Sequence, residues 1–281
     1  MAEIDNLDSL IRSALAEDLG DGDHSTLACI PPDAHGVAKM VAKQAGVLCG
    51  ARVGERVFQL VDSGLHVELL KADGDELHVG DVVLTVEGRC ASILTAERTA
   101  LNFMQRLSGI ATETRRMVGL LEGLHTRLLD TRKTTPNMRL LEKYAVACGG
   151  GTNHRIGLYD MVMLKDNHID FAGGIAQAID RTHAYLAAKG KQLKIEIEVR
   201  NLDELRQVLA HGGVDRIMLD NFSVDTLREA VRMIGHRYET EASGGITEAT
   251  LRSYAETGVD FISVGALTHH IKSLDLSLVK Q

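Results

Sequence analysis

The chain lacks tryptophan, holds only 3 prolines among its 281 residues, and has an aromatic content of only 4%. A hydrophobic core must therefore rest on Leu, Val, Ile and Ala. No apolar run approaches the roughly 20 residues that cross a bilayer, so we expect no transmembrane helix. Residues 1–20 carry acids where a signal peptide carries lysines. We therefore expect a cytoplasmic protein.

The cysteines form no pattern typical of a metal or redox site. Cys29, Cys49, Cys90 and Cys148 are widely spaced, with no CxxC pair. The chain also lacks a basic tail and has a formal net charge of −8, so we expect no nucleic-acid partner. Its length suffices for one large domain and a smaller second one.

One segment departs from this acidic character. Between Arg132 and His168, six Lys or Arg residues stand against three acids. These cations lie among Thr-Thr-Pro, Gly-Gly-Gly and Asp-Asn-His, which are residues typical of turns. Loops on a rigid scaffold collect binding groups. We therefore interpret the segment as a site for a strongly anionic ligand rather than as a solvated helix face.

The N-terminal part of the chain has the pattern of a small α+β domain. Apolar spacing predicts a helix from Leu7 that stops at Gly20, followed by a loop over 20–33. Alternating apolar runs predict short strands at 37–41, 47–49, 66–70 and 82–86, and an amphipathic helix over 51–61. A long helix is predicted over 92–122, with a break near Ser108-Gly109.

From residue 127 onward, apolar β-rich runs alternate with helical segments. The last four runs start about 22 residues apart, which is the length of one βα unit. Such units require a parallel sheet, either closed into a barrel or doubly wound. The predicted strands are 127–129, 161–164, 195–199, 216–219, 238–241 and 261–264.

Polar residues at the carboxyl ends of these strands favour the barrel. Catalytic groups of a (β/α) barrel lie at that end, whereas no GxGxxG follows a first strand as a doubly wound dinucleotide fold would require. The strand-end residues are Asp130, Lys165, Glu198, Asp220, Ser243 and Gly265.

Two of these strand ends carry carboxylates. Glu198 and Asp220 end neighbouring strands, and such a pair can hold Mg²⁺ while substrate phosphates and water complete the octahedron. Alternatively, the pair only balances the nearby cations. Glu196 lies on the same strand as Glu198. We expect only one of the two to face the barrel lumen, and the strand end favours Glu198.

Two glycine-containing turns follow the last two strands. Ser243-Gly244-Gly245 and Val264-Gly265-Ala266 each precede a helical segment. A turn of this kind offers backbone N–H groups and the positive end of a helix dipole, so both turns are candidate phosphate cradles.

The motifs of this chain resemble those of the quinolinate phosphoribosyltransferase family. The resemblance spans essentially the whole length, from AEDLG and GERVF through ERTALNFMQRLSGIAT, LLDTRKTTP and KDNHI to IEVRNLDEL, IMLDNF, SGGIT and TGVDFISVGALTH. It implies a pentosyltransferase that transfers phosphoribosyl from 5-phosphoribosyl 1-pyrophosphate to quinolinate with decarboxylation. The products would be nicotinate mononucleotide, pyrophosphate and CO₂, in de novo NAD biosynthesis.

The resemblance also implies an α/β architecture. An N-terminal α/β sandwich domain would cover 1–108 and an incomplete seven-stranded (β/α) barrel 109–266, with a C-terminal tail, 267–281, that returns to the first domain. The six strands predicted above fall one short of seven. The family forms homodimers, possibly assembled into hexamers, with shared active sites. Arg98 would be donated across the dimer interface.

Site roles follow from the same resemblance. Lys133, Lys165, Glu198 and Asp220 would be catalytic, and the two carboxylates would bind Mg²⁺ and the ribose hydroxyls. Quinolinate would be surrounded by Arg98 from the partner and by Arg132, His154, Arg155 and Lys165. Thr131 and Lys133 would contact the substrates, and the 5-phosphate would lie against Ser243, Gly244, Gly245, Val264, Gly265 and Ala266.

One position departs from the family pattern. Asn137 stands where many relatives have Gly after Thr-Thr-Pro. Because Asn tolerates a left-handed backbone better than most residues, we expect the turn to survive.

Two other functions fit parts of the pattern. A Schiff-base aldolase could use Lys165 as its nucleophile, but Glu198 and Asp220 would then have no role. A non-catalytic phosphate-binding protein would need the glycine turns but not the carboxylates. Within the family, the molybdenum-operon paralogue shares the fold, although the full set of cations favours the quinolinate enzyme.

Overall fold

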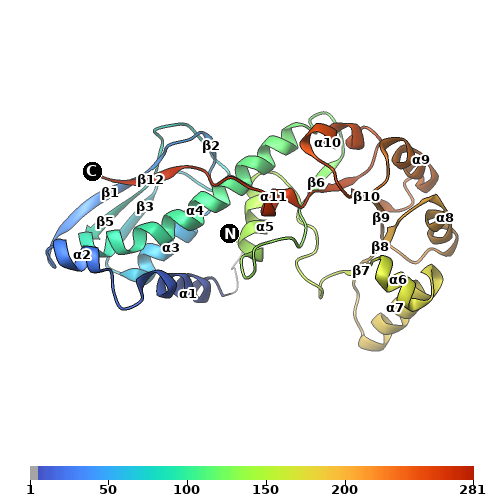
Figure 1. Ribbon diagram of the computed structural model, residues 1–281, viewed down its shortest axis with the longest axis horizontal. Coiled ribbons are helices and arrows are strands. Elements are labelled where there is room, and N and C mark those ends of the chain that lie inside the picture. The colour runs from blue at the N-terminus through green and yellow to red at the C-terminus, as the bar shows by residue number, and fades with distance from the viewer. Residues whose placement is uncertain (1–5) are drawn as a thin grey trace. The chain divides into compact units, whose positions relative to one another are not determined.

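A computed structural model describes residues 6–281 of the chain. These residues form two compact units, each built around its own sheet (Figure 1). The first unit contains the chain up to Arg116, residues 134–150 and residues 266–281; the second contains 117–133 and 151–265. Residues 1–5, which open the stretch that we expect not to be a signal peptide, lie outside the described part. Within residues 6–281, no helix has both the length and the apolar content needed to cross a bilayer.

The first unit contains an antiparallel four-stranded sheet. Its order is β12 (Leu276–Lys280), β1 (His35–Ala42), β5 (Val82–Arg89) and β3 (His66–Leu69). Met40 on β1 pairs with Leu84 on β5 and with Leu278 on β12. The C-terminal strand therefore forms an edge of this sheet. A separate two-stranded sheet joins β2 (Gly46–Val47) and β4 (Glu76–Leu77).

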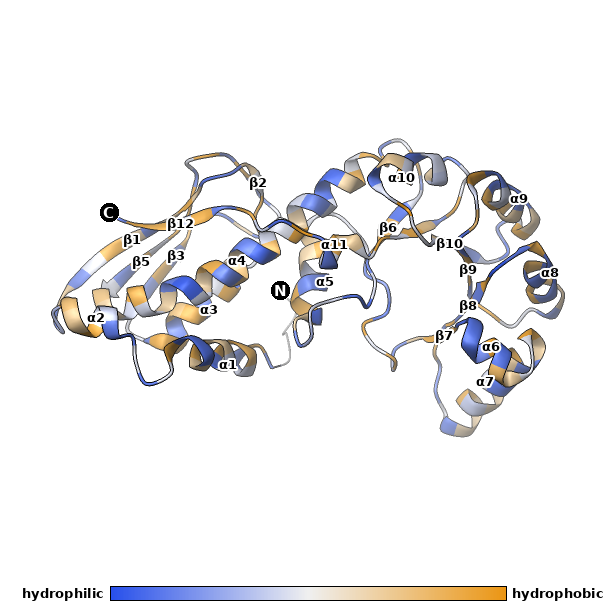
Figure 2. Ribbon diagram, in the orientation of Figure 1, coloured by the Kyte–Doolittle hydropathy of each residue, from blue (hydrophilic) through white to orange (hydrophobic). Residues whose placement is uncertain are grey.

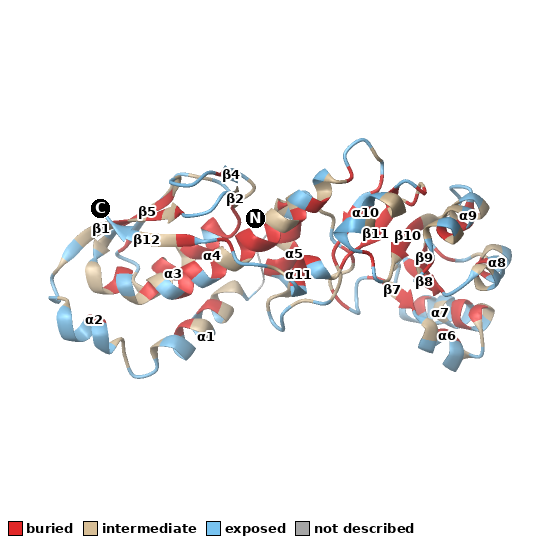
Figure 3. Ribbon diagram, turned by 45° about the horizontal axis from the view of Figure 1, so that its top comes forward, coloured by how far each residue is buried: buried red, intermediate tan, exposed pale blue. Residues whose placement is uncertain are grey.

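Apolar helix faces build the core of the first unit. Figure 2 shows the apolar stripes of its helices, and Figure 3 shows that buried residues follow them. Val57 and Phe58 on α3 and Met104 and Leu107 on α4 are fully buried. Such burial stabilises by about 2 kcal/mol per large side chain. The helices are α1 (Leu7–Leu19), α2 (His24–Cys29), α3 (Ala51–Val61), most of α4 (Cys90–Gly119), α5 (Arg139–Cys148) and α11 (Ala266–His269).

Two predictions for the first unit are wrong. The expected loop over 20–33 contains α2, because Asp23 caps it by accepting the Thr26 N–H at 3.1 Å. The expected break near Ser108-Gly109 is absent, and α4 is continuous. A Cβ at Gly109 would lie 2.3 Å from the carbonyl oxygen of Lys272, so the glycine permits close backbone approach rather than a bend. The helices predicted from Leu7 to Gly20 and over 51–61 are confirmed.

The second unit contains a six-stranded, all-parallel sheet. Its order is β6 (Arg127–Leu129), β11 (Phe261–Ser263), β10 (Glu239–Ser243), β9 (Arg216–Asp220), β8 (Ile195–Val199) and β7 (Val162–Leu164). All six strands were predicted, with ends shifted by one or two residues in several cases. Figure 1 shows α8, α9 and α10 along the outer side of the curved sheet. The helices are α6 (Asp166–Ala172), α7 (Ile175–Lys189), α8 (Leu202–His211), α9 (Val224–Ile234) and α10 (Glu248–Ala255).

Side-chain caps fix where the chain turns from strand to helix in this unit. Asn201 accepts the N–H groups of Asp203 and Glu204 at the start of α8, at 3.0 and 2.9 Å. Ser223 accepts the N–H of Thr226 at 3.2 Å at the start of α9. These caps satisfy backbone donors that a helix leaves unpaired. They therefore hold short loops at the carboxyl ends of β8 and β9.

The seventh strand position is reduced to one residue. Thr152 forms an isolated parallel bridge with Leu129, donating its N–H to Leu128 O at 2.8 Å and accepting from the Asp130 N–H at 3.1 Å. It therefore lies on the free edge of β6, at the opposite end of the sheet order from β7. One residue is too little for periodic sequence patterns to reveal.

Candidate active site

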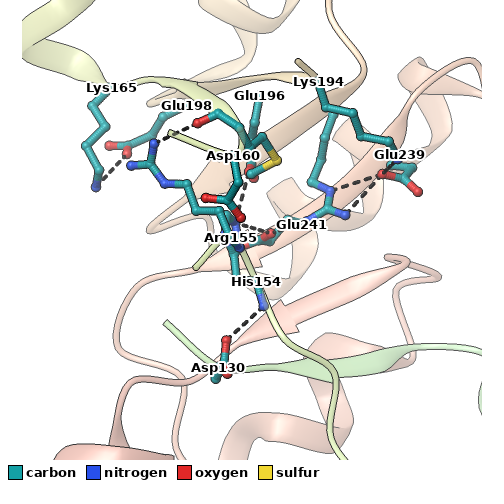
Figure 4. Close-up of polar contacts among 12 residues, drawn as sticks. Asp130, His154, Arg155, Asp160, Lys165, Lys194, Glu196, Glu198, Glu239 and Glu241 are labelled. Carbon is teal, nitrogen blue, oxygen red and sulfur yellow. Dashed lines mark hydrogen bonds and ion pairs between the residues drawn. The ribbon is translucent and has the colours of Figure 1, made fainter. Parts of the chain in front are cut away.

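The carboxyl ends of the parallel strands bring together a cation and two carboxylates. Lys165 follows β7, Glu198 lies near the end of β8 and Asp220 ends β9. The ammonium of Lys165 lies 3.6 Å from a carboxylate oxygen of Glu198, as Figure 4 shows. The Lys165 side chain is 49% exposed, whereas that of Glu198 is 10% exposed. A Schiff-base lysine needs a dry or cationic surrounding, which this carboxylate and exposure oppose.

The two carboxylates form a site that suits a divalent cation. Burial raises the pKa of Glu198, and the charge of Asp220 raises it further, while Lys165 opposes both effects. Burial likewise raises the pKa of Asp220, against the hydrogen bond from Asn221 Nδ2 at 2.6 Å. Raised pKa values mean that the local positive charge does not fully compensate the carboxylates. Oxygen ligands on adjacent strands are what Mg²⁺ prefers, so Glu198 and Asp220 fit the predicted metal site.

The segment after β6 carries the cations predicted to bind the acceptor. Asp130 is fully buried, and its carboxylate accepts the His154 N–H at 2.8 Å. The hydroxyl of Thr131 accepts the Lys133 N–H at 3.0 Å, which shapes the turn. Burial lowers the pKa of Arg155, and the neighbouring charge of Arg132 lowers it further. Two guanidinium groups that repel each other define an electropositive point suited to a carboxylate.

The ring of His154 turns into the interior of the second unit. Its Nε2 lies 2.9 Å from Glu196 Oε2 and 3.3 Å from Glu241 Oε2, and its side chain is only 6% exposed. Its Nδ1 accepts the Arg155 N–H at 2.7 Å. Direct contact of this ring with quinolinate thus stays a prediction that the described geometry does not favour.

The expectation that only one of Glu196 and Glu198 faces inward is wrong. Residues two apart on a strand lie on the same face, because side chains alternate with a period of two. Both glutamates are buried, with Glu196 deeper and Glu198 nearer the strand end. Glu241 and Arg216 were not predicted as part of this interior group. The available signal for both was a charged residue within a predicted strand, at 216–219 and at 238–241.

The turn after β10 is built for close backbone approach. Gly244 and Gly245 have positive φ values of 96° and 62°. A Cβ at Gly244 would lie 2.2 Å from Asn221 Oδ1 and 2.9 Å from its backbone nitrogen. The turn leads through Thr247 into α10. Only glycine satisfies both the conformation and the space, as a phosphate cradle requires.

The second predicted cradle is partly engaged within the protein. The Val264 N–H donates to Leu129 O at 3.0 Å, so this amide holds β11 to β6. Gly265 closes the second unit, and Ala266 begins α11, which belongs to the first unit. The N–H of Val264 is therefore already engaged in the sheet, which the sequence did not indicate.

Two predicted positions lie in the first unit. Arg98 is exposed on α4. Its expected donation to a partner's site stays a prediction. Asn137 has a φ of 64°, so the left-handed backbone expected at this turn is confirmed.

A hollow of about 560 Å³ lies at the opposite, amino-terminal ends of the strands. Its acids already have structural partners: Asp215 accepts the Ile195 N–H, Glu239 pairs with Arg216, and Asp260 accepts from Thr240. Catalytic groups of (β/α) barrels lie at the other end. We therefore place the candidate active site at the carboxyl ends. The hollow is lined by His125, Arg127, Lys194, Asp215, His236, Arg237, Tyr238, Glu239, Asp260 and Phe261.

Comparisons with known proteins agree with this fold. Residues 23–108 match the family model of the quinolinate phosphoribosyl transferase N-terminal domain, and residues 110–279 match that of its C-terminal domain. The chain is 45% identical, over 97% of its length and 77% of the relative, to a chloroplastic nicotinate-nucleotide pyrophosphorylase [carboxylating] of Oryza sativa subsp. japonica. It is 44% identical to a probable nicotinate-nucleotide pyrophosphorylase [carboxylating] of Bacillus subtilis, over 97% of this chain and 92% of the relative.

A solved structure gives the same result in three dimensions. The nicotinate-nucleotide pyrophosphorylase from Francisella tularensis superposes with a TM-score of 0.93 at 42% identity, covering 99% of this chain and 96% of that one. Sequence and structure thus agree along both units, and the chain belongs to the quinolinate phosphoribosyl transferase family.

Proposed function

We propose that this protein transfers phosphoribosyl from 5-phosphoribosyl 1-pyrophosphate to quinolinate and decarboxylates the product. The reaction yields nicotinate mononucleotide, pyrophosphate and CO₂, a step of de novo NAD biosynthesis. The observation that carries the proposal is the match of both family domains along the chain, together with a strand-end site where Lys165 lies beside the buried Glu198 and the half-buried Asp220.

The cations suit quinolinate, which is a pyridine with two adjacent carboxylates. Arg132 and Arg155 offer planar forks that can bind carboxylates in two places and so fix the orientation of the ring. Lys165 adds a charge next to Glu198. Held in this way, the pyridine nitrogen faces C1 of the ribose, and positioning replaces a covalent intermediate.

The carboxylates suit the other substrate. Glu198 and Asp220 would hold Mg²⁺, which neutralises charge on the departing pyrophosphate. The same two carboxylates would accept hydrogen bonds from the ribose hydroxyls, and Lys133 would lie between the two substrates. The turn Ser243-Gly244-Gly245 would receive the 5-phosphate on its N–H groups.

The bond changes need no protein nucleophile. The pyridine nitrogen donates its electron pair to C1 as the bond from C1 to pyrophosphate breaks. The ring is then cationic, so it stabilises the electron pair left at C2 when the 2-carboxylate departs as CO₂, and a proton takes its place. Preorganised charge at the strand ends supplies the stabilisation.

The proposal includes a cytoplasmic homodimer. Arg98, exposed on α4, would complete the acceptor site of the partner, as the family resemblance implies. Hexamers would be assemblies of such dimers.

The test is a reaction of the purified protein with quinolinate, phosphoribosyl pyrophosphate and Mg²⁺, with nicotinate as a parallel acceptor. We expect equal amounts of nicotinate mononucleotide and CO₂ from quinolinate and no product from nicotinate. Arg132→Ala should abolish turnover, while Arg252→Ala, a surface change on α10, should preserve it. Folded, dimeric protein that makes no product from quinolinate would refute the proposal, as would equal use of nicotinate.

A further inference from the structure

A group of buried charges lies beneath the acceptor site. Glu196 on β8 and Glu241 on β10 are both fully buried, and His154 lies between them. Arg216 on β9 donates to Glu241 at 3.1 Å and to Glu239 at 3.1 Å. Figure 4 shows Glu196 and Glu241 on either side of the chain at His154. Burying charges costs several kcal/mol each unless they are paired. Because this group of charges costs free energy to bury, we looked for a function that would account for it.

The geometry fixes the form of the histidine ring. The Nδ1 of His154 accepts the Arg155 N–H, so the proton of the ring sits on Nε2 and points to the two carboxylates. Burial alone would lower the pKa of His154, but Glu196 and Glu241 raise it to about 9. The carboxylates thus favour a proton on this ring. Nε2 is the nitrogen that presents the proton to them, because Nδ1 faces the Arg155 N–H.

The donor set also has the spacing of a metal site, since one atom each of His154, Glu196 and Glu241 lie within 4.8 Å of one another. Arg216 already supplies a positive charge to Glu241, however. A cation would have to displace or tolerate this guanidinium at close range. The arrangement fits a fixed support of paired charges better than a metal centre.

The support leads directly to a substrate-binding arginine. The backbone N–H of His154 is held by Asp130, and the N–H of Arg155 is held by the His154 ring. The Arg155 guanidinium in turn donates to Met161 O at 3.1 Å. The next two N–H groups, of Ile156 and Gly157, donate to Asp160 at 2.7 and 2.8 Å. An irregular loop is thus tied to β6, β8 and β10 at the residues around Arg155.

We propose that Glu196 and Glu241 are positioning residues for the acceptor site: they hold the His154 ring, and through it the Arg155 backbone, so that the guanidinium meets a carboxylate of quinolinate. This inference rests on the proposed function. Neither glutamate touches the substrate. Sub-ångström placement of a binding group controls the rate of a reaction that depends on orientation.

The experiment compares Glu196→Gln with Glu196→Leu. Glutamine keeps an oxygen that can accept from Nε2, whereas leucine fills the space without one. We expect the leucine variant to raise the KM for quinolinate by about tenfold, with the KM for phosphoribosyl pyrophosphate within about twofold of wild type. The glutamine variant should stay close to wild type. Ile217→Ala, at a fully buried position of β9, is the control for lost stability alone.

A double-mutant cycle separates positioning from packing. In an Arg155→Ala background, Glu196→Leu should have little further effect on the dissociation constant of quinolinate, measured by calorimetry without turnover, because its effect passes through Arg155. Full additivity, or an equal rise in both KM values, would overturn the inference. Nitrogen-15 NMR of the His154 ring reads out the tautomer without requiring turnover, so it tests the support even if the proposed function fails. A proton on Nδ1 in the wild type would also overturn the inference.

Discussion

The hydrogen bonds that the Asp62 carboxylate accepts make the stability of the folded chain depend on pH in the acid range. Asp62 follows α3, and its carboxylate accepts from Ser92 Oγ at 2.7 Å, from the Gly64 N–H at 2.9 Å and from Arg89 Nε at 2.9 Å. These bonds, with that from Ser92 the strongest, lower the pKa of Asp62 to about 2. The unfolded chain would bind a proton near 3.8. The stabilisation is therefore fully present above that value and is lost as the pH falls through about 2.

We accordingly expect Asp62→Asn to lower the free energy of unfolding by about 2 kcal/mol at neutral pH, with a smaller difference as the pH falls below about 4. Urea unfolding of both proteins at several pH values measures this difference. Asp225→Asn, at a side chain that is 96% exposed, should show no such trend. A difference independent of pH would mean that the ionised carboxylate is not the source of the stability.

At the same scale, the direction of the His154 ring could not be predicted from the sequence. The resemblance to the family placed its ring against the substrate. The direction of its ring depends on Glu196 and Glu241, which come from strands tens of residues away. A linear pattern records which residues are present at strand ends, but not which way each side chain turns inside the sheet.

At the scale of the element, α4 and its Gly109 make a sharp test. A Cβ at Gly109 would lie 2.3 Å from Lys272 O and 3.0 Å from Ser273 Cα, whereas one at Gly119 in the same helix meets nothing within 4 Å. We expect Gly109→Ala to destabilise by about 2 kcal/mol through overpacking. Gly119→Ala should stabilise by up to about 1 kcal/mol through helix propensity.

Thermal unfolding of the two glycine variants measures the contrast. Because both changes add the same methyl group to one helix, intrinsic propensity cancels between them. Equal shifts in Tm would show that the segment around Lys272 moves aside without cost.

Elements with strong periodicity were the ones that sequence predicted well. The two amphipathic helices and the six parallel strands follow from spacing alone, since apolar residues recur with the period of each structure. The short helix α2 could not be predicted from apolar spacing, because it depends on the cap formed by Asp23. The single-residue bridge at Thr152 could not be predicted either, because it depends on the neighbouring strand β6. The continuity of α4 was not predicted, because a Ser-Gly pair inside a helix is compatible either with a bend or with close approach of another backbone.

At the scale of the whole molecule, the proposed homodimer predicts complementation. A variant with Arg98→Ala mixed with a variant with Lys165→Ala should form hybrid dimers with one intact site, if Arg98 acts across the interface. With random exchange, activity should recover to about a quarter of wild type. A mixture of Lys165→Ala and Arg155→Ala should stay inactive, because both residues belong to the same protomer's site. Failure of the first mixture despite measured subunit exchange would contradict the shared site.

The strand β12 has a consequence for the order in which the protein is made. It completes the first sheet by pairing with β1, although some 240 residues separate the two in the chain. The parallel sheet of the second unit, by contrast, is complete once residue 265 has emerged from the ribosome. The first sheet lacks this strand until residues 276–280 have been synthesised, with the edge of β1 uncovered in the meantime. It is therefore completed after the parallel sheet, although β1 is synthesised before any of the parallel strands.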